Sequence, residues 1–164
     1  MRGESPVFER VVIIDFMSIE ESISVECPKC KHEQDIVVWS SLNAQVSPEA
    51  KAQFISGDLN VFVCQECEAR VSLAMPLLYH DMELQFCVQF YPPESLEDEA
   101  TLRLYEPDGS VVAGNVFSSA SNPDMMEKMR YVLRPHVVFS MQEALMHVLF
   151  RENLALFHAH GTSA

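Results

Sequence analysis

The clearest hydropathy pattern in the first half of the chain is a strand–turn–strand unit that occurs twice. Residues 22–26 alternate polar and apolar side chains, as a half-buried strand does, and Ile36-Val37-Val38-Trp39 resumes β-type residues after a turn. The second copy begins at Val61-Phe62-Val63 and continues into a strand predicted over residues 70–75. We therefore expect two similar units that face each other.

A helix is predicted between the two copies. Ser47 is placed as an N-cap, Pro48 occupies the first helical position and Glu49 adds an acid to the first turn. Gly57 supplies the stop signal.

The second half of the chain predicts two more strands and a long helix. Residues 84–91 are strongly apolar, and residues 131–139 predict a strand that Pro135 confines to an edge or a bulge. A capping box at Ser140 begins a helix over residues 140–153, with one apolar face. Residues 92–99, with two prolines and several acids, are the best linker candidate.

Shorter signals complete the pattern. Glu106-Pro107-Asp108-Gly109 is typical of a type I turn, and Asn122-Pro123-Asp124 is typical of a helix start. Residues 158–164 are expected to form a loose tail.

Composition and charge narrow the class of protein. Of 164 residues, 48% are hydrophobic and 21% are charged, which excludes wholesale disorder. The net charge of −13 opposes binding to phosphate backbones and to anionic membranes. No apolar run approaches the ~20 residues of a membrane span, and no secretory signal pattern is recognised, so we expect a cytoplasmic protein with no membrane contact.

Four of the five cysteines form two Cys-x-x-Cys pairs, which lie in the turns of the two copies. Cys27 and Cys30 are separated from Cys64 and Cys67 by 33 residues. Zinc prefers four such thiolates in a tetrahedron at about 2.3 Å, and a closed shell of this kind supports structure rather than hydrolysis. We predict one structural Zn²⁺ held by these four residues, and interpret Cys87 as a buried small hydrophobe.

Other interpretations of the cysteines stay open. The four thiols could be reduced with no ion, they could be redox-active, or His32 could replace one cysteine as a ligand. Another thiolate-preferring metal could also take the place of zinc.

With both motifs in place, the chain resembles the CpXC family, which is named for two Cys-Pro-x-Cys motifs. The resemblance implies a zinc-ribbon-like module and no known activity. Gln65 stands where the family has proline, and Lys31 and Glu68 stand where glycine often follows and eases a positive-φ turn. The segments that carry the resemblance are Cys27-Pro28-Lys29-Cys30, residues 38–43, residues 57–62, Cys64-Gln65-Glu66-Cys67 and residues 76–82.

The predicted fold class is α+β. A zinc-ribbon-like β module with an inserted helix covers residues 22–91, and a C-terminal strand–helix part over residues 92–164 continues from it, either separate or packed on it as one domain. Residues 1–21 are expected to form an N-terminal arm, and Met17 is a candidate native start.

One further constellation carries catalytic chemistry. Tyr79-His80-Asp81 combines a phenol, an imidazole and a carboxylate, so an enzyme could use His80 as a base in a cleft. The structural alternative makes His80 a hydrogen-bonded core residue and Asp81 a turn cap. The other histidines, among them His136 and His147, show no mutual ligand spacing.

The leading functional hypothesis is a non-enzymatic interaction module with a protein partner of unknown identity, and a homodimer through the 140–153 helix is one form of it. An enzyme built on Tyr79, His80 and Asp81 is the second hypothesis. A nucleic-acid-binding ribbon that uses Lys29, Lys31 and Arg70 is the third, and the net charge of −13 disfavours it.

Overall fold

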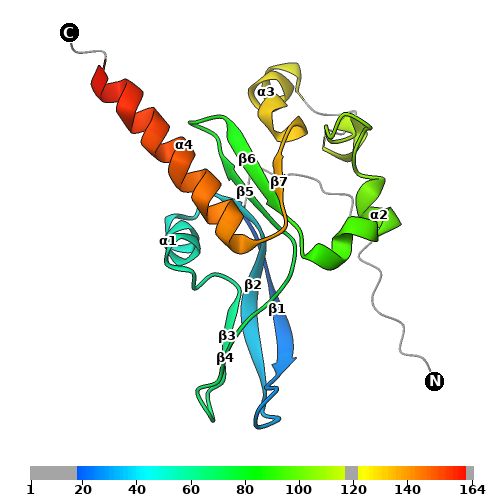
Figure 1. Ribbon diagram of the computed structural model, residues 1–164, viewed down its shortest axis with the longest axis vertical. Coiled ribbons are helices and arrows are strands. Elements are labelled where there is room, and N and C mark those ends of the chain that lie inside the picture. The colour runs from blue at the N-terminus through cyan, green and yellow to red at the C-terminus, as the bar shows by residue number, and fades with distance from the viewer. Residues whose placement is uncertain (1–17, 117–121, 162–164) are drawn as a thin grey trace.

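A five-stranded mixed sheet forms the centre of the computed structural model, which describes residues 18–116 and 122–161 (Figure 1). Together with the helices it confirms the α+β fold class. β1 pairs antiparallel with β2, β2 parallel with β5, β5 antiparallel with β6, and β6 parallel with β7. The strands are β1 (Ile19–Glu26), β2 (Glu33–Asn43), β5 (Leu77–Asp81), β6 (Phe86–Phe90) and β7 (His136–Val138).

A separate two-stranded hairpin consists of β3 (Val61–Val63) and β4 (Arg70–Ser72). In Figure 1 this hairpin and the β1–β2 hairpin extend in the same direction, away from the helices. The repeated strand–turn–strand unit of the sequence is therefore confirmed as two hairpins.

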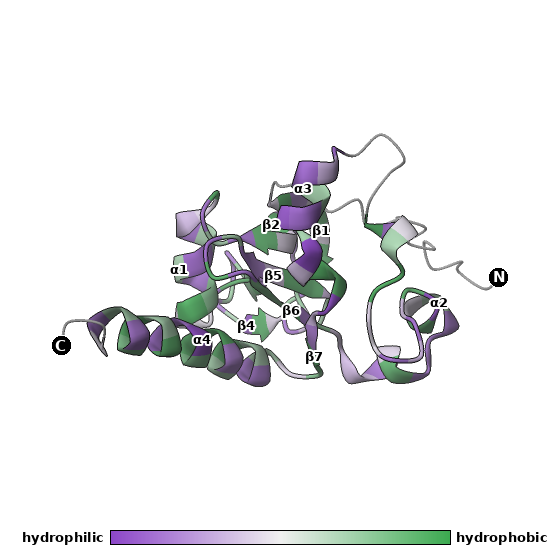
Figure 2. Cartoon of the chain, turned by 90° about the horizontal axis from the view of Figure 1, so that it is seen from above, coloured by the Kyte–Doolittle hydropathy of each residue, from purple (hydrophilic) through white to green (hydrophobic). Residues whose placement is uncertain are grey.

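Helices cover both faces of the sheet (Figure 2). α1 (Pro48–Ser56) and α4 (Met141–Gly161) lie on one face, and α3 (Pro123–Lys128) with the 3₁₀ turn Arg130–Leu133 lies on the other. The region between β6 and α3 contains α2 (Glu99–Leu102) and two further 3₁₀ turns, Pro93–Glu97 and Ala113–Asn115.

The alternation of side chains along β5 divides the core between the two faces. Tyr79 packs with Phe54 of α1, with ring centroids 5.1 Å apart, and belongs to the same cluster as Val148 of α4. Leu78 belongs to the opposite cluster with Cys87, which is buried as expected.

Several helix and turn signals are confirmed. Gly57 ends α1 in the left-handed conformation, with φ +77°. Ser47 occupies the N-cap of the same helix, although its side chain makes no capping hydrogen bond. Asn122 caps α3 by accepting from the Asp124 amide at 2.9 Å, and the Gly109 amide closes its turn.

The capping box at the start of α4 is present in altered form. The Glu143 amide donates to Ser140 Oγ at 3.1 Å, while the Glu143 carboxylate accepts from the Phe139 amide at 3.2 Å rather than from Ser140. The helix then runs to Gly161, well past residue 153 and into the tail expected to be loose.

Strand boundaries differ from expectation where local turns intervene. Residues 82–85 form a turn in which Gln85 has φ +50°, so the apolar strand begins at Phe86 and residues 77–81 form an unforeseen strand of their own. Only residues 136–138 of the predicted 131–139 strand are extended, because residues 130–133 form a 3₁₀ turn. As Pro135 indicated, this strand lies at a sheet edge.

Two other expectations shift. β1 begins at Ile19, so part of the expected N-terminal arm is strand, and residues 1–17, including Met17, lie outside the described residues. The linker candidate at 92–99 forms the 3₁₀ turn Pro93–Glu97 and the start of α2.

Candidate metal centre

The two cysteine pairs occupy the turns of the β1–β2 and β3–β4 hairpins. The four Sγ atoms all lie within 4.8 Å of one another. Cys27 Sγ is 3.6 Å from Cys67 Sγ, and Cys30 Sγ is 3.5 Å from Cys64 Sγ. Sulfurs at the corners of a tetrahedron with Zn–S bonds of about 2.3 Å are about 3.8 Å apart, so the separations fit one ion.

Both turns have the same backbone geometry. The Lys31 amide donates to the Cys27 carbonyl at 3.0 Å, and the Glu68 amide donates to the Cys64 carbonyl at 3.0 Å. Lys31 and Glu68 have φ +66° and +58°. These residues therefore adopt the conformation that glycine eases, and the turns keep their shape without glycine.

A small core lies directly beneath the cysteines. Cys27, Cys64 and Phe62 are almost completely buried, and Ile36 and Val71 are among the partly buried residues that pack against them. Because few apolar side chains belong to this small core, other contacts are needed to fix the two hairpins relative to each other.

Two polar side chains that the sequence gave no reason to single out supply such contacts. Gln34 of β2 donates to the Val63 carbonyl at 3.0 Å and accepts from the Gln65 amide at 2.9 Å, so it bridges the hairpins. Asn60 accepts from the Trp39 amide at 2.7 Å and donates to the Trp39 carbonyl at 2.8 Å. The Asn60 side chain thus makes two hydrogen bonds to the backbone of β2 of the kind that a neighbouring strand would make.

The thiols differ in their readiness to ionise. The Cys30 amide, ahead of weaker effects, lowers the pKa of Cys27 to about 6. The His32 amide lowers the pKa of Cys30, but desolvation and the neighbouring cysteines outweigh it and raise that pKa to about 12. The cluster therefore stabilises one thiolate but resists ionising as a set, and a bound cation would relieve that repulsion.

The basic residues beside the cluster are largely paired with acids. Lys31 Nζ lies 3.1 Å from Glu26, and the Arg70 guanidinium pairs with Asp58. Of the three basic residues in the nucleic-acid hypothesis, two are therefore neutralised by acids, and Lys29 makes no ion pair within the described part of the chain.

Tyr79, His80 and Asp81 are adjacent in β5 but do not converge. His80 is fully buried, and its Nδ1 lies 3.2 Å from the Tyr131 hydroxyl on the opposite face from Tyr79. Burial lowers the pKa of His80 to about 4. Asp81 accepts from the Leu84 amide at 2.8 Å and caps the following turn. This geometry favours the structural interpretation.

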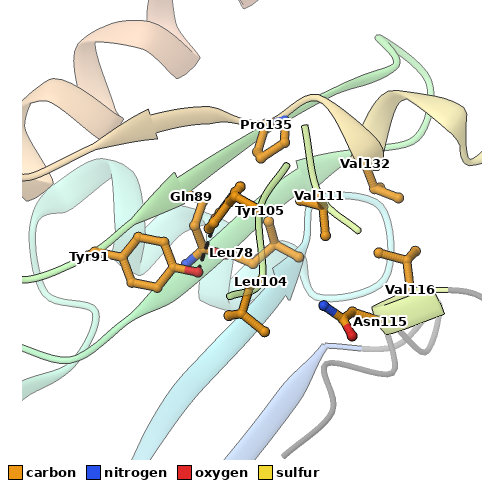
Figure 3. Close-up of a pocket in the computed structure, with 10 residues that line it drawn as sticks. All are labelled: Leu78, Gln89, Tyr91, Leu104, Tyr105, Val111, Asn115, Val116, Val132 and Pro135. Atoms are coloured by element: carbon orange, nitrogen blue, oxygen red, sulfur yellow. Dashed lines mark hydrogen bonds between the residues drawn. The ribbon is translucent and has the colours of Figure 1, made fainter. Parts of the chain in front are cut away.

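An apolar pocket lies on the same face as His80 (Figure 3). Its volume is about 30 Å³, and Tyr91 and Tyr105 close one side with a hydrogen bond of 3.0 Å between their hydroxyls. A space of this size holds a water molecule and excludes a substrate.

Paired hairpin turns bring four cysteines together at one point, an arrangement of the cysteine-knuckle class that could hold a metal ion. The chain matches the family model described as CpXC protein over residues 25–158, which is most of its length. It belongs to the CpXC family. Comparison with curated proteins gave no match, and comparison with solved structures gave none either. Within the described part of the chain, no helix combines the length and apolar character needed to cross a bilayer.

Proposed function

We propose that the protein is a non-enzymatic cytoplasmic interaction module in which one structural Zn²⁺ holds the two hairpins together and the outer face of α4 binds a second copy of the chain. The four thiolates would fill the coordination shell of zinc and leave no position for a reactive water. A reducing compartment such as the cytoplasm keeps cysteines in the thiol form that binds metal.

The observation that carries this proposal is an uncovered apolar stripe on α4. Met146, Phe150 and Phe157 are 61%, 59% and 71% exposed, and Leu154 lies on the same face. Figure 1 shows the C-terminal turns of the helix extending past the sheet. Exposed apolar stripes of this kind mark interaction surfaces.

The spacing of the stripe fits a second copy. Met146 and Leu154 lie four residues before and after Phe150, so an antiparallel pair of α4 helices crossing at Phe150 places each Met146 opposite the partner's Leu154. The stripe carries no charged side chain between Met146 and Phe157, since Arg151 and Glu152 lie on other faces of the helix. Two chains of net charge −13 can therefore meet there without opposing acids at the contact.

Analytical ultracentrifugation of the zinc-loaded protein tests the proposal. We expect a dimer that Phe150→Glu converts to a monomer. Leu102→Glu is the matched control, because Leu102 is 56% exposed on α2, and it should leave the dimer intact. A monomeric wild type at all accessible concentrations, or equal behaviour of the two variants, would contradict the proposal.

A further inference from the structure

A second pocket opens where β6, β7 and α4 meet, on a different face of α4 from the apolar stripe. Its volume is about 390 Å³, within the range of small-molecule sites. Its lining includes two arginines, Arg134 and Arg151, and two histidines, His136 and His147. No Asp or Glu is among the described residues that line it, although acids outnumber bases by 24 to 11 in the chain.

Arg151 is held in a fixed orientation at this pocket. Its guanidinium carbon lies 4.6 Å from the centre of the Phe86 ring, and Nη2 donates to the Leu84 carbonyl at 3.3 Å. A guanidinium has five N–H donors, so further donors stay available for a ligand. Stacking on an aromatic ring limits its motion and reduces the entropy lost on binding.

The two imidazoles come from different elements and stack on each other. His136 of β7 and His147 of α4 have ring centroids 3.9 Å apart and an interplanar angle of 11°. Burial, followed by the charges of His136 and Arg151, lowers the pKa of His147. Protonation of His147 is thus disfavoured until a negative charge is placed beside it.

The remaining groups around the histidines do not supply that negative charge. Tyr131 and Cys87 face the pocket, and burial raises the pKa of both well above neutral, so both are uncharged. Arg134 at the rim lies 3.6 Å from Asp108. Glu152, which follows Arg151 in the chain, pairs with Lys51. Among the ion pairs of the described residues, none joins an acid to Arg151, His136 or His147.

We propose that this pocket binds the phosphate group of a small phosphate monoester. Arg151 offers a planar fork that matches two phosphate oxygens, His136 and His147 offer ring N–H donors, and Arg134 adds charge at the rim. The pocket is larger than a phosphate group alone, which leaves space beside Phe86 for the rest of the molecule. A dianion bound beside the imidazoles favours their protonated form by charge attraction.

NMR titration of the zinc-loaded full chain tests this inference. Inorganic phosphate and phenyl phosphate are the two probes, and the imidazole signals of His136 and His147 are the readout. We expect saturable shifts of both signals with either probe, and tighter binding of phenyl phosphate because its ring contacts the pocket. Acetate is the carboxylate control and should bind more weakly than phosphate.

Variants distinguish specific binding in this pocket from non-specific attraction of anions to positive charge on the protein. Arg151→Met should weaken phosphate binding about tenfold or more, while Arg103→Met, which removes an exposed arginine at the C-cap of α2, should leave it unchanged. His136→Asn, at an exposed position, should also weaken binding and serves if Arg151→Met does not fold. Absent or non-saturable shifts in the wild type, or equal losses in Arg151→Met and Arg103→Met, would overturn the inference.

Sulfate isolates the role of the histidines, because its charge does not change between about pH 8 and pH 5, whereas both phosphate probes change their charge within this range. We expect sulfate affinity to rise as pH falls through this range, and the rise to be reduced in His136→Asn. Sulfate binding that is independent of pH in the wild type would contradict the proposed role of the imidazole pair.

Discussion

Two regions of the molecule are stabilised in different ways. One is the sheet where it packs against α1 and α4, and the other is the pair of hairpin tips. The layer against α1 and α4 buries thirteen apolar side chains in one cluster, from Leu42 to Val148, whereas the hairpin tips bury three, two of which are cysteines. A cluster of three cannot offset the conformational entropy of two ordered hairpins. The comparison suggests a reason for the position of the cysteines: a metal ion bound at the tips would replace the core that the tips lack.

The largest expected effect comes from removal of the metal, which should destabilise the hairpin tips far more than the sheet. Cys64→Ser, or a chelator, should remove on the order of 10 kcal/mol of stabilisation, the free energy that the proposed four-thiolate site would contribute when it holds its metal. We expect amide hydrogen exchange to lose protection in the β1–β2 and β3–β4 turns while β5, β6 and the first turns of α4 stay protected. Cys87→Ala, which removes a buried thiol outside the cluster, is the control and should keep one metal per chain. Uniform loss of protection throughout the sheet would show that the two regions are not separable.

Low pH should destabilise the sheet that packs against α1 and α4, because His80 is buried in it. The pKa of this buried imidazole is lowered to about 4 from 6.5, so below pH 6.5 the unfolded chain binds a proton that the folded chain does not. Stability should therefore fall between about pH 6.5 and pH 4, by about 3 kcal/mol in total. Urea unfolding at a series of pH values measures this loss.

His80→Gln is the variant that assigns the acid effect. The difference in stability between pH 6.5 and pH 4 should shrink by about 3 kcal/mol in this variant, and loss of metal at low pH cancels because it affects both proteins. His160→Gln, at an exposed position in the last turn of α4, should retain the full dependence. An unchanged slope in His80→Gln would refute the assignment.

The smallest expected effect concerns Gln34, whose side chain bridges the two hairpins. Gln34→Leu removes two hydrogen bonds in a partly exposed position, so we expect a loss of about 1 kcal/mol, confined to the tips. Hydrogen exchange of the Gln65 amide in the zinc-loaded protein is the measurement. Gln53→Leu, on the exposed side of α1, should not change it. Equal protection in both variants would mean that the ion alone fixes the hairpins.

How far the sequence predicted these features depends on whether the signal was local. The cysteine pairs, the stop at Gly57 and the capping serine at 140 rest on neighbouring residues. The structure brings the four cysteines together and confirms the stop and the cap. Gln34 and Asn60 act on partners 21 or more residues away, so no spacing in the sequence pointed to their roles. The boundaries of β5 and β6 were missed because the turn at residues 82–85 contains no glycine or proline.

The candidate sites, too, could be predicted only where the signal lay in neighbouring residues. The four cysteines could be assigned because each pair carries its own turn, whereas His136 and His147 meet only through the packing of β7 against α4. Conversely, Tyr79, His80 and Asp81 are adjacent in sequence, but the alternation of a strand that the sequence did not reveal places His80 on the opposite face from Tyr79 and Asp81.

The position of the cysteines along the chain also bears on how the molecule folds. β2 and β5 pair in parallel, so the 33 residues between them, including α1 and the β3–β4 hairpin, must form a crossover before these strands meet. An ion that joins Cys30 to Cys64 closes most of that crossover while the chain is still unfolded and so reduces the loop-closure entropy of the parallel pairing. Zinc present during refolding should therefore accelerate the formation of the central sheet, a kinetic role in addition to the structural role proposed for it.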